Sequence, residues 1–268
     1  MAVLLGMASE KIHRPHNIKL WRWITFFASQ ILLHIFIDAF NNYGVGWFEP
    51  FSHYRISFNA IYVADPFFSL WPAIAFVALL VINRNSPRRK QWWVFGVAIS
   101  FIYLGYCLFN KANINRQVTN AFVAQGITHT RYFTTPTPLQ NWLWYVVAGN
   151  DSGYYVGYRS VFDSKPQIDF TYFPRNDSLL RGIATSEDVA QLIRFSQQFY
   201  TVEKWDSTLV FNDLRFGQTK GWNNPHEKFA FHYFLERPAD NLMVVQRGRF
   251  AKWNWHTMQQ LLERIKGN

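Results

Sequence analysis

Four polar side chains recur at every fourth position in an otherwise apolar stretch near the N-terminus: Gln30, His34, Asp38 and Asn42. On a helix this spacing aligns them along one face. An imidazole and a carboxylate one turn apart can bind the same metal ion, or the carboxylate can orient the imidazole from outside the metal shell. A buried hydrogen-bonded pair that only fixes helix packing is the alternative, and spacing alone leaves both interpretations open.

A complete metal site needs more donors than this pair supplies. Catalytic zinc typically takes three protein ligands and one water molecule. The nearby sequence adds only Glu49, His53 and Asp65 as candidates. We expect zinc first and manganese second, because mixed histidine and carboxylate sites accept both ions. Asp38 is also the candidate catalytic carboxylate.

Asp65 and Arg55 each have a structural and a functional interpretation. Asp65 precedes Pro66, which is typical of a helix N-cap followed by proline in the first turn, so we expect capping. Arg55 is the only positive charge between positions 41 and 60. It could bind a substrate phosphate or carboxylate, but an ion pair with Glu49 or Asp65 is the favoured interpretation.

Three apolar segments are the elements that would position these residues. They cover about residues 20–40, 61–82 and 92–109, and each approaches the length of about 20 residues that spans a hydrocarbon core. Tryptophans at the segment ends fit the aromatic belt of a membrane interface. The sequence therefore predicts a helical bundle of about three transmembrane helices over residues 1–110, in contact with the lipid bilayer.

The positive charges predict an orientation for this bundle. Lysines and arginines precede the first segment and fill the link at 83–91, whereas the link at 41–60 carries Arg55 alone. The positive-inside rule places the N-terminus and the 83–91 link in the cytoplasm. If all three predicted helices span the membrane, the chain is a multi-pass protein. The residues after Phe109 then lie outside the cytoplasm.

Beyond Asn110 the sequence reads as a soluble domain, residues 111–268, which holds thirteen of the 17 acidic residues. Helices are expected over 111–126, Glu187–Phe199 and Trp255–Ile265. The strand-like runs are Trp142–Ala148, Tyr154–Phe162, Ile168–Phe173, Ser207–Asn212, Phe229–Leu235 and Leu242–Val245. Aromatic residues that crowd the first two runs are interpreted as sheet packing. This pattern predicts an α+β domain with an antiparallel sheet.

Several functional classes are disfavoured by composition. The net charge of +10 is shared about equally by the two parts without a dense basic block, so no nucleic-acid partner is expected. Cys107 is the only cysteine, which excludes an intrachain disulfide and a cysteine-based zinc site. The sequence contains no Gly-x-Ser-x-Gly elbow and no phosphate-binding loop.

The stretch HIFIDAFNNYGVGWFEPFSHYRISFNAIYVADPFF, from His34 to Phe68, resembles the bacterial YdjM-like family of inner-membrane metal-dependent hydrolases associated with the LexA regulon. The matching motifs are His34/Asp38, Tyr43-Gly44, Pro50-Phe51-Ser52, Arg55 and Asp65-Pro66. A second block, PTPLQNWLWYVVAGNDSGYYVGYRSVFD, resembles the C-terminal domain of the family, so the resemblance spans roughly residues 20–165. It implies a metal-assisted hydrolase of the bacterial inner membrane with His34 and Asp38 among its ligands, and it gives no substrate.

The chain departs from the family pattern upstream of His34. Members usually begin with a further membrane segment that carries a Thr-His, a Pro-Asp-x-Asp and a His-Arg-Gly-x-Thr-His-Ser, none of which precedes His34 here. Met1–Met7 resembles the tail of such a helix, and the likeness of Gly126–Thr130 to the last motif is interpreted as coincidence. We therefore expect the N-terminal His-rich segment to be lacking and the chain to hold half of a metal site.

Two functions follow from these observations. The leading one is a membrane-bound metal-dependent hydrolase whose small-molecule or lipid substrate is unknown, with activity of the 268-residue chain itself left open. The alternative is a non-catalytic membrane-anchored protein whose exterior domain binds a partner or an envelope component. Association into a homo-oligomer is compatible with both.

Overall fold

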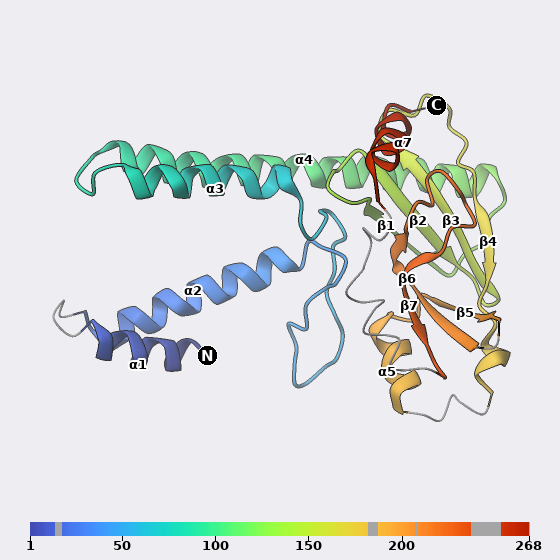
Figure 1. Ribbon diagram of the computed structural model, residues 1–268, viewed down its shortest axis with the longest axis horizontal. Helices are drawn as coiled ribbons and strands as arrows, with labels where there is room; N and C mark the ends of the chain where they lie inside the picture. Colours follow the sequence, from blue (N-terminus) through green and yellow to red (C-terminus); the bar gives the residue numbers. More distant parts are fainter. Residues whose placement is uncertain (14–17, 182–186, 207, 237–252, 268) are drawn as a thin grey trace. The chain divides into compact units, whose positions relative to one another are not determined.

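The computed structural model describes residues 1–13, 18–181, 187–206, 208–236 and 253–267. The chain divides into two compact units, Met1–Asn59 and Ala60–Asn268. In Figure 1 the first unit is drawn in blue, and the second runs from cyan through green and yellow to red.

The first unit begins with a pair of packed helices, α1 (Ala2–Ile12) and α2 (Leu20–Asp38). Gly6 lies at their contact, where an added Cβ would come within 2.8 Å of the Ile24 side chain, so a residue without a side chain permits the close approach. The prediction of a helix over 20–40 is confirmed. α2 is 19 residues long and apolar enough to cross a membrane.

The rest of the first unit is a loop that closes back on the end of α2. Val45 and Ile56 exchange two backbone hydrogen bonds of 2.9 Å, and the Phe58 amide donates to the Ala39 carbonyl at 2.7 Å. The rings of Phe40 and Phe58 lie 5.0 Å apart across this closure. The loop therefore has a defined conformation at the C-terminal end of α2, next to the predicted metal ligands.

The second unit starts with a hairpin of two packed helices, α3 (Pro66–Val81) and α4 (Arg88–Ala124), seen side by side in Figure 1. Gly96 permits their contact, because a Cβ there would lie 2.6 Å from that of Ala75. The guanidinium of Arg89 donates to the carbonyls of Leu79 and Ile82 at 2.6 and 2.8 Å. These bonds satisfy carbonyls at the end of α3 that have no partner within the helix.

Two predicted boundaries in this hairpin are wrong. α3 begins at Pro66 rather than at 61, because the Asp65-Pro66 pair starts the helix, and it is 16 residues long. The helices predicted over 92–109 and 111–126 are one continuous helix of 37 residues. No proline or glycine lies between 106 and 125 to end it, and the polar side chain of Asn110 is accommodated by contacts with Asn141.

By length and composition, the described residues contain two helices suited to crossing a membrane, α2 and α4, and the shorter apolar helix α3. The structure is therefore helical in its N-terminal half, and the count of three transmembrane helices stays a prediction. The predicted domain boundary at 110 also stays a prediction, with α4 running through that position without interruption.

The C-terminal half contains antiparallel sheet structure, as predicted, and its described residues form two separate sheets where one was expected. The first has the order β1-β2-β3-β4 and the second the order β5-β6-β7. The strands are β1 (Arg131–Pro136), β2 (Leu143–Gly149), β3 (Gly153–Ser160), β4 (Thr171–Pro174), β5 (Tyr200–Trp205), β6 (Thr208–Gln218) and β7 (Phe229–Phe234). β1 and β5 were not expected from the sequence, and the predicted strand Leu242–Val245 lies outside the described residues.

Among the described residues of this half, the helical elements are a short 3-10 helix and two α-helices. They are η2 (Asp177–Leu180), α5 (Glu187–Phe195) and α7 (Trp255–Ile265). The predicted helix over Trp255–Ile265 is confirmed in full. The helix predicted over Glu187–Phe199 begins as expected but ends at Phe195, since Gln197 and Gln198 both adopt left-handed backbone conformations.

Alternate residues of β2 pack into two different cores. Tyr145 and Tyr154 lie in a cluster with residues of the second sheet and of α5, whereas Trp144 packs against the C-terminal part of α4. This division follows from the two-residue repeat of a strand. All three side chains are buried, so the interpretation of these aromatic residues as sheet packing is confirmed.

Candidate metal site and its surroundings

The side chains of His34 and Asp38 lie next to each other, as their four-residue spacing on a helix predicted. The His34 Nε2 and Asp38 Oδ2 atoms lie 3.2 Å apart in the last turns of α2. Their side chains are 77% and 43% exposed, so the described protein does not seal the pair beneath packed side chains. The described residues therefore leave both groups open to the surroundings of α2.

The other two members of the polar row behave differently. Gln30 is exposed on α2, one turn before His34. Asn42 lies beyond the end of the helix and is buried at 2% exposure. The predicted row is therefore correct only as far as Asp38, because the chain leaves the helix to form the loop that closes on Ala39.

His53 pairs with Glu49 instead of joining His34. Its Nδ1 lies 3.0 Å from Glu49 Oε1 in a second exposed histidine–carboxylate pair with the same four-residue spacing. In the described ranges no three histidine, cysteine or acidic side chains gather where they could hold one metal ion. His34 and Asp38 thus fit two coordination positions, and the described chain supplies no third ligand beside them.

Arg55 is held by backbone carbonyls. Its Nε donates to the Tyr43 carbonyl at 3.2 Å and its Nη2 donates to the Gly44 carbonyl at 2.7 Å. The favoured ion pair with Glu49 is wrong, because the Glu49 carboxylate contacts His53. Gly44 has φ of +70° and would place a Cβ 3.0 Å from the Ile56 carbonyl oxygen, which explains a glycine beside the arginine contact.

Asp65 caps α3, as predicted. Its Oδ1 accepts hydrogen bonds from the amides of Phe67 and Phe68 at 2.9 and 3.2 Å. Its Oδ2 accepts one from the Tyr103 hydroxyl of α4 at 2.9 Å. Both carboxylate oxygens are therefore engaged in holding the helix hairpin together.

The junction of the helix hairpin with the sheet domain had no signal in the sequence. The Asn110 side chain donates to the backbone and side-chain oxygens of Asn141 at 3.0 and 3.1 Å. Asn141 in turn donates to the Ala60 carbonyl at 2.7 Å. The Trp142 indole donates to the Tyr106 hydroxyl at 2.9 Å. Only the three-dimensional structure brings these residues together.

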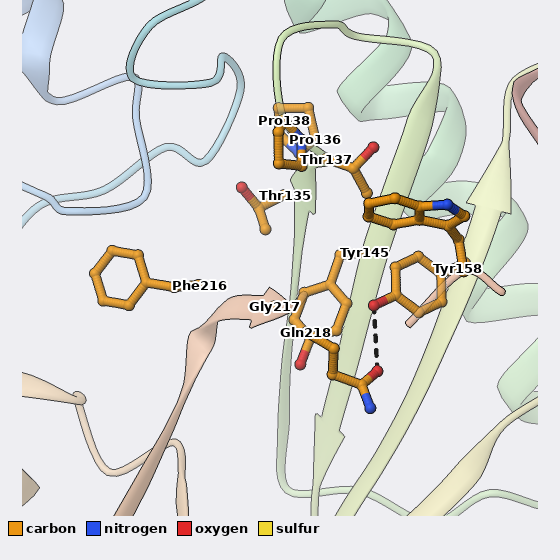
Figure 2. Close-up of a pocket in the computed structure, with 10 residues that line it drawn as sticks. Thr135, Pro136, Thr137, Pro138, Tyr145, Tyr158, Phe216, Gly217 and Gln218 are labelled. Carbon is orange, nitrogen blue, oxygen red and sulfur yellow. Dashed lines mark hydrogen bonds between the residues drawn. The ribbon is translucent and has the colours of Figure 1, made fainter. Parts of the chain in front are cut away.

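The sheet domain also encloses a small hollow between its two sheets, shown in Figure 2. Tyr145 and Tyr158 line it, and the Tyr158 hydroxyl donates to Gln218 Oε1 at 3.2 Å. Its volume is about 10 Å³, room for no more than one water molecule. The hollow is therefore too small to hold an organic ligand.

Comparison with known protein families gives a match for the N-terminal part of the chain. Residues 1–114 match the YdjM inner membrane protein family. The match confirms the resemblance seen in the motifs from His34 to Asp65, and it includes the first unit, α3 and most of α4. With the two candidate membrane helices, the YdjM match supports a membrane protein in contact with a lipid bilayer. No curated protein and no solved structure shows significant similarity to the chain.

Proposed function

We propose that the chain is a membrane-bound hydrolase of the YdjM type in which His34 and Asp38 bind a divalent metal ion, zinc in preference to manganese. The observation that carries this proposal is the exposed imidazole–carboxylate pair, 3.2 Å apart at the end of α2. A histidine and an aspartate within one turn of an apolar candidate membrane helix are costly unless they serve an ion or a reaction.

The residues of the pair have distinct roles in this proposal. The Asp38 carboxylate lies beside His34 Nε2, so it can hold the ring orientation or share the ion. A bound divalent ion would supply a nucleophile by lowering the pKa of a coordinated water. Because the described residues complete no three-ligand set, turnover requires a further donor that the pair does not provide.

Arg55 is the proposed substrate-binding residue. A guanidinium has five N–H donors, and carbonyl oxygens of Tyr43 and Gly44 accept from its Nε and Nη2. These two bonds fix the plane of the group while leaving donors for a phosphate or carboxylate. A small molecule or lipid with such a group is therefore the expected substrate class.

The proposed location is the bacterial cytoplasmic membrane, with several passes and with the sheet domain outside the cytoplasm. Arg84, Arg88, Arg89 and Lys90 at and after the α3–α4 turn support this orientation. The positive-inside rule keeps such short basic links in the cytoplasm. α4 would then carry the chain outward to the sheet domain.

A second candidate function is a membrane anchor whose exterior domain binds a partner or an envelope component. One observation favours it: α4 passes without a break from its apolar part into the packing of the sheet domain. The domain is thus fixed to the candidate membrane helix rather than joined by a linker. This function needs no complete metal site.

The metal content of the purified full-length protein tests the leading proposal. The wild type is expected to retain up to about one zinc or manganese ion per chain, and His34→Ala and Asp38→Ala are expected to lose it. His226→Ala is the matched control, because it removes another exposed histidine from the sheet domain. Equal metal content in the wild type and the His34 variant would remove the ligand assignment and leave the anchor function.

A further inference from the structure

A groove lies between α4 and the segment that follows β3. It has a volume of about 470 Å³, within the range of small-ligand sites. Its lining residues are Gln117, Asn120, Ala121, Ala124, Gln125, Arg159, Ser164, Pro166 and Gln167. None of these belongs to the candidate metal site.

The wall on α4 follows from helix periodicity. Gln117, Asn120, Ala121 and Ala124 are spaced by three and four residues, so they share one face of the helix. The small side chains of the two alanines leave space above this face of the helix. A larger side chain at Ala124 would occupy that space. The spacing gives the groove an apolar strip bordered by carboxamides.

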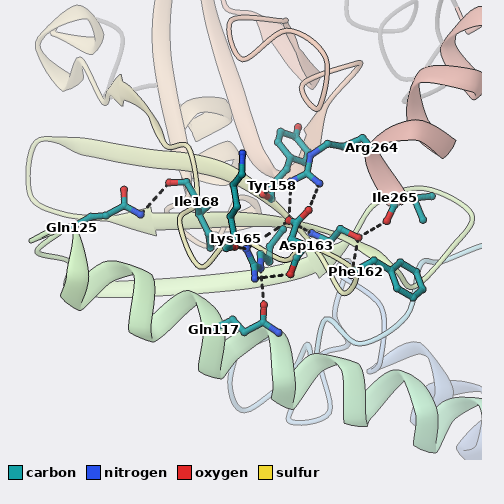
Figure 3. A network of polar contacts seen from close by, with 11 residues as sticks. Gln117, Gln125, Tyr158, Phe162, Asp163, Lys165, Ile168, Arg264 and Ile265 are labelled. Carbon is teal, nitrogen blue, oxygen red and sulfur yellow. Dashed lines mark hydrogen bonds and ion pairs between the residues drawn. The ribbon is translucent and has the colours of Figure 1, made fainter. Parts of the chain in front are cut away.

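Arg159 closes the inner side of the groove but offers no accessible charge. The residue is 4% exposed, and its Nε donates to Gln117 Oε1 at 2.6 Å. Its remaining contacts are to the Lys165 and Asp163 carbonyls and to the Asp163 carboxylate at 3.8 Å. Arg264 binds the same carboxylate through two hydrogen bonds, at 2.7 and 3.0 Å, in the network of Figure 3.

The same network orients two carboxamides. Gln117 accepts from Arg159 through its oxygen, so its NH₂ group remains as a donor. Gln125 donates to the Ile168 carbonyl at 3.1 Å, so its oxygen remains as an acceptor. Figure 3 shows both glutamines projecting from α4 toward the segment that holds Lys165 and Ile168. The groove therefore presents a fixed donor and a fixed acceptor.

Asn120 and Gln167 add two exposed carboxamides to the lining. Each carboxamide both donates and accepts hydrogen bonds. Hydroxyl groups do the same, so a ligand rich in hydroxyls can pair with all four amides. Ala124 and Pro166, which are exposed, supply apolar surface for the face of a sugar ring.

We propose that this groove binds a neutral saccharide. Neutrality is expected because Arg159, the only charged residue of the lining, is 4% exposed and engaged by Gln117 and backbone carbonyls, and the exposed lining residues carry amides, a hydroxyl and small apolar side chains. The site lies on the sheet domain and is independent of His34 and Asp38, so it does not rest on the proposed hydrolase activity. In the proposed anchor function, a saccharide bound in this groove would be the envelope component that the exterior domain recognises.

Ligand-observed NMR on the full-length protein tests the proposal, in a detergent without a sugar head group. The probes are maltose, cellobiose and diacetylchitobiose, with trialanine amide as the peptide comparison, each up to about 10 mM, ten times a Kd of about 1 mM. We expect saturable binding of at least one disaccharide and none of the peptide. Loss of one hydrogen bond should weaken binding about 3- to 10-fold in Asn120→Ala and in Gln167→Ala.

Two further variants make the result specific. Ala124→Phe should abolish binding by filling the groove, while its α-helical signal stays that of the wild type. Gln191→Ala, which removes an exposed glutamine from α5, should bind like the wild type. No disaccharide binding, preference for the peptide, or equal binding by the wild type and all groove variants would each overturn the assignment.

Discussion

Asn110 and Asn141 are hydrogen-bonded through buried amides 31 residues apart, one in the middle of α4 and the other in the link between β1 and β2. The two bonds from Asn110 Nδ2 to Asn141, at 3.0 and 3.1 Å, continue to the Ala60 carbonyl at 2.7 Å. Three parts of the second unit thus meet at a polar contact that excludes water. Buried polar groups of this kind are costly when one partner is removed.

Asn141→Leu is therefore expected to destabilise the second unit by about 1–3 kcal/mol, because it leaves the buried Ala60 carbonyl unpaired and removes the side-chain acceptor of the Asn110 amide, which keeps only its bond to the backbone carbonyl of residue 141. Thermal unfolding of the purified protein in detergent measures the effect. Gln191→Ala, a change at an exposed position, serves as the control. Unfolding of Asn141→Leu at the wild-type temperature would show that the network contributes nothing to stability.

Asp65→Ala should destabilise α3 by about 0.5–2 kcal/mol through loss of its N-cap. Asp65→Ser keeps an oxygen that can accept from the amides of Phe67 and Phe68 and should retain most of the stability. Urea unfolding followed by circular dichroism compares the two. Equal losses in both variants would assign the stabilisation to the Tyr103 contact instead of the cap.

The orientation of the sheet domain is testable with single cysteines introduced after Cys107→Ala. Asp151→Cys, in the turn between β2 and β3, should react with a membrane-impermeant thiol reagent on intact cells whose outer membrane is permeable to it. Asn85→Cys, in the turn between α3 and α4, should react only after the inner membrane is broken. The opposite labelling pattern would place the sheet domain in the cytoplasm.

Stability should also depend on pH through His232 in β7. Burial lowers the pKa of His232 below its ordinary value of 6.5. Near and below pH 6.5 the unfolded chain therefore binds a proton at His232 that the folded chain does not bind. The contribution of His232 to the free energy of unfolding is complete above pH 6.5 and is lost as the pH drops through and below that value. Unfolding temperatures across this range measure the loss.

Two histidine variants make the pH experiment specific. His232→Phe should flatten the dependence, because it removes the group that titrates differently in the folded and unfolded chains. His226→Ala, at an exposed position nearby in the sequence, should leave it unchanged. A steep loss that persists in His232→Phe would assign the dependence to another group.

The sequence predicted those elements that depend on local pattern. The apolar run of α2, the turn between Gly149 and Gly153 and the Asp65 cap all arise from neighbouring residues. β1 was missed because the run Arg131–Pro136 mixes a charge, two threonines and a proline, and its strand character comes from pairing with β2. The continuity of α4 was missed because Asn110 looks like a boundary until its partner is known.

The two candidate sites also differ in whether the sequence could reveal them. His34 and Asp38 were found together because one helical turn joins them, and their distance follows from that turn. The groove could not be found, since Gln117 and Gln167 are 50 positions apart in the sequence. Only the packing of α4 against the first sheet brings them into one lining.

The uninterrupted length of α4 has a mechanical consequence. A helix of 37 residues is about 55 Å long at 1.5 Å per residue, and its outer part is packed against the first sheet. A membrane helix adjusts its tilt to the thickness of the surrounding lipid. In the proposed topology, in which α4 crosses the membrane, such an adjustment would tilt the sheet domain together with the helix, so lipid composition would set the height and inclination at which its groove faces the surroundings.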